Sequence, residues 1–199
     1  MSERLWARTW RLAAVSLLPL LLLGCSFVNP SGALAQERMA LAPPPAGIRV
    51  DSLPVGYQAG GTLGFTLRET PIQEQVYRRN VGAERGLLWS AQFVSRWPLD
   101  EAQLDRWSAQ AIGLIADGLG NDVRLAGWER LDASDVGDQR IAYRYQLANA
   151  SGVPLGEATI VVFARGDQVG MAGTGAIGTQ VPVDAASLAR ALDGAARRG

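Results

Sequence analysis

The sequence contains no histidine and no lysine, because all nineteen of its basic residues are arginine. Without histidine there is no imidazole base and no His-ligated metal site. Without lysine there is no Schiff-base nucleophile and no lysine to hold a nucleotide phosphate. The sequence therefore predicts no catalytic residue, no metal site and no bound cofactor.

Cysteine is almost as scarce, since Cys25 is the only one and no intramolecular disulfide can form. Apolar residues make up 48% of the chain and charged residues 19%, which is ordinary for a globular protein with a single domain. The formal net charge of zero gives no sign of the basic surface that nucleic-acid binding requires. We expect neither nucleic acid nor nucleotide among the partners.

The amino terminus has the pattern of a secretory signal. Arg4, Arg8 and Arg11 precede an apolar run of thirteen residues from Leu12 to Gly24. A helix of that length cannot cross a bilayer, which needs roughly 20 residues. We therefore predict that residues 1–24 are a signal peptide that the export machinery removes.

The run ends in Leu22-Leu23-Gly24-Cys25-Ser26, which resembles the lipobox of bacterial lipoproteins. The resemblance implies that Cys25 becomes the first residue of the mature protein and carries a diacylglycerol thioether with acyl chains such as palmitate. It also implies a protein held at the membrane surface of the cell envelope, on the periplasmic or other extracytoplasmic side.

A second processing site competes with the first. Ala33-Leu34-Ala35 before Gln36 fits ordinary signal peptidase, and cleavage after Ala35 would release a soluble periplasmic product. This site lies ten residues beyond the apolar run, which is an unusually long spacing. The two sites exclude each other, and we favour Cys25.

Proline, glycine, alanine and serine dominate the segment that follows, with three consecutive prolines from Pro43 to Pro45. Such a composition cannot bury enough apolar surface to order itself, and a proline run favours extended polyproline II. We therefore expect residues 25–59 to comprise the lipidated cysteine and a flexible tether. Residues 60–196 are then the single folded domain.

Alternating apolar residues predict strands, and a 3.6-residue period predicts helices. Asp100 is suited to cap a long helix that Gly118 and Gly120 end, and Asp184 a short carboxyl-terminal one. Residues 72–83 are expected to form either a loop or a further short strand. Strands are expected over residues 62–68, 86–96, 123–131, 139–147, 157–164 and 168–173.

These elements predict an α+β domain, in which an antiparallel sheet of about five to six strands is covered by one long and one carboxyl-terminal helix. The expected core contains Trp89, Phe93, Trp107, Ile115, Tyr143, Tyr145, Val162 and Phe163. The element order and the segment Thr159 to Met171 (TIVVFARGDQVGM) resemble the Mog1/PsbP-like family. That resemblance implies a layered sandwich with a non-enzymatic binding or assembly role.

Several short motifs match the residue types of a known functional motif but lack the spacing or the surrounding elements that the function requires. Residues 173–178 (GTGAIG) match the dinucleotide fingerprint, yet too little chain follows to complete a parallel βαβ fold, so we interpret them as a flexible exit from the last strand. Asp132, Asp135 and Asp138 lack the spacing of a calcium loop and are expected in a solvated turn. Residues 165–167 (RGD) and 149–151 (NAS) are interpreted as hairpin turns.

Two functions from different classes remain. The first is a lipid-anchored, non-catalytic domain that binds a protein or another ligand at the envelope. The alternative is a small envelope hydrolase that uses carboxylates alone. Glu69, Glu74, Asp100 and Glu129 are scattered over different predicted elements, so no pair of acids can be chosen for it.

Overall fold

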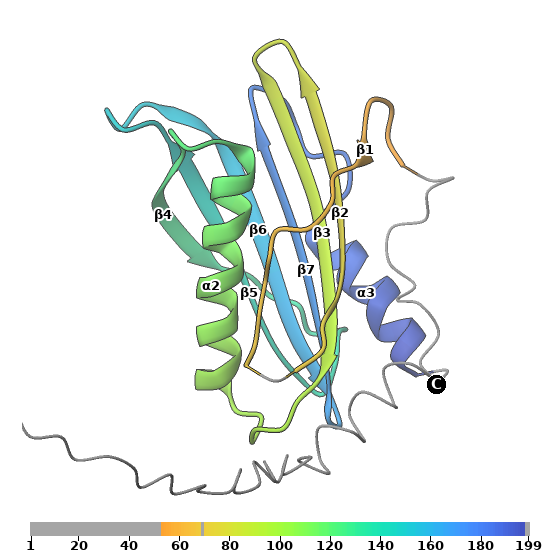
Figure 1. Ribbon diagram of the computed structural model, residues 1–199. Helices are drawn as coiled ribbons and strands as arrows, with labels where there is room; N and C mark the ends of the chain where they lie inside the picture. The colour runs from red at the N-terminus through yellow and green to blue at the C-terminus, as the bar shows by residue number, and fades with distance from the viewer. Residues whose placement is uncertain (1–52, 69, 198–199) are drawn as a thin grey trace, which may run out of the picture.

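The computed structural model describes residues 53–68 and 70–197, which form one sheet between two helices (Figure 1). The chain passes through β1 (Gln58–Ala59), β2 (Gln73–Val81), β3 (Glu84–Val94), α2 (Glu101–Leu119), β4 (Arg124–Arg130), β5 (Gln139–Ala148), β6 (Pro154–Arg165), β7 (Gln168–Ile177) and α3 (Ala185–Ala196).

The sheet has seven strands in the order β1-β2-β3-β7-β6-β5-β4, and every neighbouring pair is antiparallel. The predicted α+β class and antiparallel sheet are confirmed. The sheet is wider than the five to six strands expected, because residues 73–81 form a full strand and the short β1 pairs with it. Helix α2 connects the inner strand β3 to β4 at the far edge.

Both helices begin where the sequence indicates. The Asp100 carboxylate accepts a hydrogen bond from the Gln103 N–H at 2.7 Å, and the Asp184 carboxylate accepts one from the Ser187 N–H at 2.7 Å. Each bond satisfies a backbone donor that the first helical turn leaves without a partner. Gly120 ends α2 as predicted, whereas Gly118 lies inside the helix.

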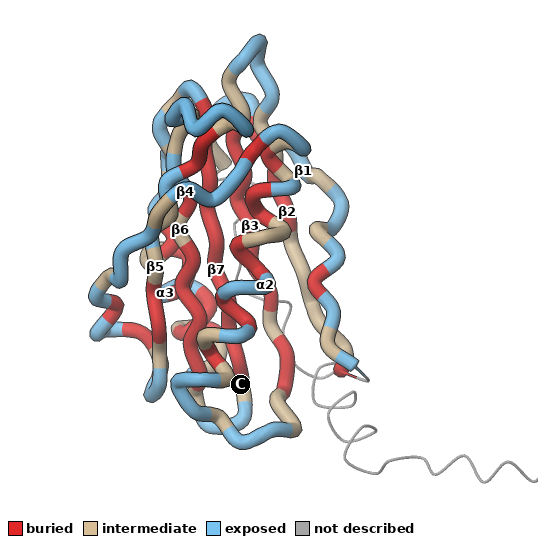
Figure 2. The backbone as a smooth tube through the Cα atoms, turned by 90° about the vertical axis from the view of Figure 1, so that its left-hand side faces the viewer, coloured by how far each residue is buried: buried red, intermediate tan, exposed pale blue. Residues whose placement is uncertain are grey.

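The two helices lie on opposite faces of the sheet, so each face has its own core (Figure 1). The central strand β7 is buried along almost its whole length (Figure 2). Tyr143 and Tyr145 pack against the α2-side core but remain partly exposed, and Phe163 belongs to the α3-side core. The other expected core residues are buried on the α2 side: Trp89, Phe93, Trp107, Ile115 and Val162.

The predicted strand over residues 62–68 is wrong. Within this segment only Leu67 forms a strand-like pairing, an isolated bridge with Thr70, and the rest of the segment is irregular. Gly64, in the middle of the segment, adopts a left-handed φ angle of 76°, which differs from the extended backbone of a regular strand. The alternating apolar residues still serve the core, since Phe65 is buried against Trp89.

The signal peptide, Cys25 and the alternative processing site at Ala35 and Gln36 lie outside the described residues, as does the expected tether up to residue 52. Residues 53–59 are described and contact the domain. Tyr57 is buried, and the last two of these residues, Gln58 and Ala59, form β1 and pair with β2. The described fold therefore begins a few residues before Gly60.

Candidate functional site

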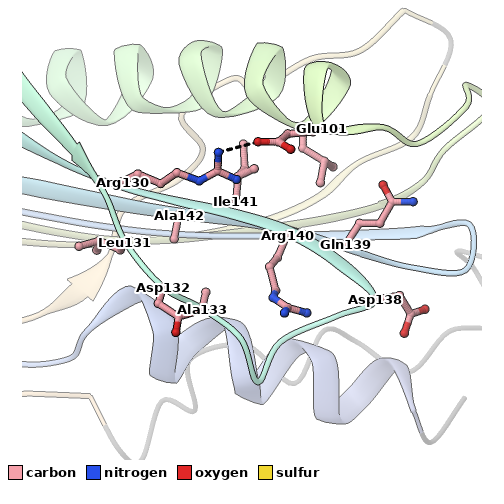
Figure 3. A pocket seen from close by; sticks show the side chains of 11 residues that line it. Glu101, Arg130, Leu131, Asp132, Ala133, Asp138, Gln139, Arg140, Ile141 and Ala142 are labelled. Carbon is pink, nitrogen blue, oxygen red and sulfur yellow. Dashed lines mark hydrogen bonds and ion pairs between the residues drawn. The ribbon is translucent and has the colours of Figure 1, made fainter.

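A cavity of about 420 Å³ lies at the edge of the sheet where β4 ends. Strand β5 begins at Gln139, but β4 stops at Arg130, which pairs with Tyr143. The first residues of β5 therefore extend past their neighbour, and residues 131–138 leave the sheet beside them. Figure 3 shows the side chains that line the resulting hollow.

The backbone of β5 is partly open at this cavity. The Leu131 N–H donates to the Ala142 C=O at 2.8 Å, so Ala142 faces the β4 side. Alternate residues of an antiparallel strand face the same neighbour, and Arg140 therefore turns its N–H and C=O to the side where β4 has ended. Backbone groups of this kind can pair with an added extended segment.

Charged side chains of both signs line the cavity, and two of its acids are engaged by arginines. Glu101, at the start of α2, accepts a hydrogen bond from Arg130 at 2.6 Å (Figure 3). This bond raises the pKa of the Arg130 guanidinium above its ordinary value. Asp138 forms an ion pair of 2.9 Å with Arg165. Both acids are thus held as partners of cations.

Arg140 differs from these residues. It lines the same cavity and is partly buried, and it forms no ion pair or hydrogen bond through its side chain with any described residue. A partly buried cation without a partner favours an anionic group placed beside it. Arg140 is therefore the residue of the cavity best suited to hold an acidic ligand group.

A second cavity of about 320 Å³ lies next to the first. Leu131, Asp132, Ala133 and Ala142 line both hollows, so the first residues after β4 separate them. The second cavity continues along the α3 side of the sheet to Asp184 at the start of α3. A ligand larger than a small molecule could contact both.

Aromatic rings lie on the α2 side of the same edge. Trp128 is 66% exposed, and its ring meets Tyr143 edge to face with centroids 5.4 Å apart. The Tyr143 hydroxyl donates to the Asp105 carboxylate at 2.7 Å. Burial, followed by this hydrogen bond, raises the pKa of Tyr143 to about 12, so the hydroxyl remains protonated at neutral pH.

Of the four acids that the sequence leaves scattered, the structure describes three, and each of these has a partner of its own. The Glu74 carboxylate accepts hydrogen bonds from the Trp89 indole at 2.6 Å and from the Leu63 N–H at 2.8 Å. Asp100 caps α2, and Glu129 pairs with Arg144 at 2.9 Å. Glu69 lies outside the described residues. Glu74, Asp100 and Glu129 are thus each engaged by a different partner.

The acidic turn is bound to its surroundings by arginines. Asp135 pairs with Arg190 of α3 at 3.1 Å, and Asp138 pairs with Arg165. No group of three residues able to hold a metal ion occurs in the part of the chain that the structure describes. Residues 165–167 do form the β6–β7 turn, as predicted, with Gly166 at a φ of 58°.

The interpretation of residues 173–178 as a flexible exit from the last strand is wrong. Strand β7 continues to Ile177, so residues 173–177 are buried between β3 and β6, and Gly178 is exposed directly after the strand. The glycines let α2 approach the sheet, because a Cβ at Gly173 would lie 2.3 Å from Cδ1 of Ile115. The glycines of this motif therefore allow α2 to pack closely on the sheet.

Sequence reasoning did not identify Glu101, Arg130 and Arg140 as neighbours in one cavity. A signal for the site was present in β4, since residues 124–130 (RLAGWER) contain three charges and a tryptophan without a buried face. Such a strand is typical of an exposed sheet edge. Its early end, which creates the cavity, carries no comparable pattern.

Comparison with known proteins finds no matching family model, no similar curated protein and no similar solved structure. The lipobox and the PsbP-like resemblance therefore stay predictions. Within residues 53–68 and 70–197, no helix has the length and apolar character needed to span a membrane.

Proposed function

We propose that this protein is an exported, lipid-anchored and non-catalytic binding domain at the bacterial cell envelope. Export and anchoring are supported by the charged amino terminus, the short apolar run and Cys25 directly after it. Binding is supported by the cavity beside β4 and β5. The partner is a protein segment in an extended conformation that carries an acidic side chain.

The observation that carries this proposal is the combination of Arg140 with the open backbone of β5. An extended segment placed there would exchange hydrogen bonds with the backbone at Arg140, as in β-strand addition. An acidic side chain on that segment would meet the guanidinium of Arg140. Backbone pairing gives affinity in such complexes, and the charge gives selectivity.

The ion pairs of the cavity support binding over hydrolysis. A carboxylate-dependent hydrolase needs one protonated carboxyl group as its general acid. Glu101 and Asp138 each already bind an arginine of the protein. Neither carboxylate is therefore free to contact a bound substrate.

Site-specific photocrosslinking in intact cells tests the binding proposal. A photoreactive residue at the exposed position of Gln139 should form one discrete product, which Arg140→Glu should abolish by repelling the acidic partner. Arg106→Glu reverses a charge on the exposed side of α2 and should leave the product unchanged. A product that Arg140→Glu leaves intact would contradict the proposed site.

Mass spectrometry of the mature amino terminus tests the anchor separately. We expect a peptide that begins at Cys25 and carries acyl chains. An unmodified peptide that begins at Gln36 would establish a soluble periplasmic protein and would leave the binding site to be judged by the crosslink alone.

One observation keeps the hydrolase as a second candidate, because Glu101, Asp132 and Asp138 line the same cavity. That function predicts hydrolysis of activated glycosides or esters that Asp132→Asn abolishes without loss of folding. Turnover unchanged by Asp132→Asn would remove this candidate.

A further inference from the structure

A segment without regular structure covers part of the sheet beside α2. Residues 61–68, which we call the strap, run along the α2 side of β2 and β3 (Figure 1). A Cβ added at Gly118 of α2 would lie 3.0 Å from Cδ2 of Leu63. Gln110 of α2 donates to the Thr66 C=O at 3.3 Å. The strap therefore lies between α2 and the β2 end of the sheet.

The backbone of the strap has few partners. Among the N–H groups of residues 61–66, only that of Leu63 donates to a described residue, the Glu74 carboxylate of β2 at 2.8 Å. Strand β2, by contrast, pairs with β3 along all nine of its residues. Segments with few backbone hydrogen bonds are the ones that open locally. The strap can therefore lift without breaking the ladder beneath it.

One aromatic side chain fastens the strap to the core. Phe65 is 3% exposed, and its ring packs edge to face on Trp89 of β3 with centroids 5.8 Å apart. The same ring stacks on Phe93 with centroids 6.3 Å apart. Phe65 thus covers two large rings of the α2-side core, and both would meet water if the strap lifted.

A single carboxylate oxygen joins the strap to the ring beneath it. Oε1 of Glu74 accepts hydrogen bonds from the Leu63 N–H at 2.8 Å and from the Trp89 indole N–H at 2.6 Å. Lifting the strap breaks the first bond and lets water reach the second. The Leu63 amide and the Trp89 indole should therefore lose their protection from solvent in the same event.

We propose that the strap opens as a unit while the sheet and both helices stay folded, and so acts as a lid on the α2-side core. The closed strap keeps Trp89 and Phe93 from water, and the open strap presents both rings at the surface beside α2. Arg140 and its cavity lie at the opposite end of the sheet, beside β4 and β5. The lid therefore does not depend on the proposed binding site.

Native-state hydrogen exchange of the mature chain in detergent, followed by NMR, tests the lid. The Leu63 amide and the Trp89 indole should have protection factors at least about a hundredfold below that of the Met171 amide in the central strand β7. Low urea should leave both unchanged, because the opening exposes little surface, and should accelerate exchange at Met171. Equal protection and urea dependence at all three positions would overturn the proposal. An indole that stays protected while Leu63 exchanges would also overturn it.

Two substitutions should favour the open strap. Phe65→Ala removes the ring that fastens it and should lower the protection of Leu63 and Trp89 by at least about tenfold. Gly64 has a left-handed φ of 76°, and a Cβ there would meet no atom within 4 Å. Gly64→Ala therefore strains only the backbone of the closed strap and should lower the same protection about tenfold.

Gly152, in the β5–β6 turn, is the matched control for Gly64. Its φ is 81°, and a Cβ there would also meet no atom within 4 Å. Gly152→Ala imposes the same backbone strain far from the strap and should leave the protection of Leu63 and Trp89 unchanged. Equal effects of the two glycine substitutions would show that the strap opens only when the whole protein unfolds, which would overturn the proposal.

Discussion

The guanidinium of Arg165 binds both carboxylate oxygens of Asp193, with the Nη2 to Oδ2 distance at 2.9 Å. Arg165 ends β6, whereas Asp193 is a buried residue of α3. Arg197 adds a second ion pair to Asp193 at 2.8 Å. The terminal helix is therefore attached to the sheet by a charge network as well as by apolar contacts.

This network predicts how stability depends on pH. Burial disfavours the charged form of Asp193, but hydrogen bonds from Arg165 and Arg197 outweigh it and lower its pKa to about 2. A group whose pKa is lower in the folded state stabilises the fold above its unfolded pKa. We expect a loss on the order of 2 kcal/mol as the pH falls from about 4 to about 2.

Urea denaturation at a series of pH values measures this loss. Asp193→Asn should destabilise the protein near neutral pH and should remove the dependence between about pH 4 and pH 2. Asp135→Asn breaks the exposed pair with Arg190 on the same helix and should change stability by less than about 1 kcal/mol. Equal effects of the two variants would contradict the assignment.

Trp107 provides a prediction about the α2-side core. Its side chain is 3% exposed and meets Phe93 edge to face, with ring centroids 5.0 Å apart. Trp107→Ala should cost about 3 to 5 kcal/mol in free energy of unfolding, measured by urea denaturation. The exposed Trp128 is the matched control. In dilute protein Trp128→Ala should change stability by less than about 1 kcal/mol.

Tyr143 and Asp105 predict a smaller effect at the candidate site. Tyr143→Phe removes the 2.7 Å hydrogen bond and should cost about 1 kcal/mol. The pKa of Tyr143 is raised, so the stability it contributes is present below pH 10 and is lost as the pH rises toward 12. A pH titration that follows tyrosinate absorbance should therefore lose its transition at the highest pH in Tyr143→Phe. A titration curve that this substitution leaves unchanged would contradict the prediction.

The sequence predicted the elements whose signals are local. The caps at Asp100 and Asp184, the apolar stripe of α2 and the turns between β4 and β7 all lie within a few residues of the features that determine them. The β7 glycines were misinterpreted because their role depends on Ile115 of α2, far away in the chain. Local pattern cannot reveal that a glycine is needed for a distant contact.

The candidate site was beyond prediction for a related reason. The cavity exists because β4 ends at Arg130 while β5 begins at Gln139, and no residue pattern marks that offset. Its lining combines Glu101 from α2 with Arg140 from β5, which only the crossover from β3 to the far edge brings together.

The close approach of α2 to β7 gives the last prediction. A Cβ added at Gly173 would lie 2.3 Å from Cδ1 of Ile115, so Gly173→Ala should cost about 1 to 3 kcal/mol. Ile115→Val removes that methyl group and alone should cost about 0.5 to 1.5 kcal/mol. In the double variant the two changes compensate, and the loss should fall below the sum of the single losses by about 1 kcal/mol.

Gly113 of α2 is the matched control, because a Cβ there meets no atom within 4 Å. Gly113→Ala should stabilise the protein by about 0.5 to 1 kcal/mol, since alanine is the better helix former and restricts the unfolded chain. Denaturant midpoints of all four variants decide the question. Additive losses in the double variant would mean that Ile115 does not limit the residue at position 173. The glycine would then be explained by some other contact of the central strand.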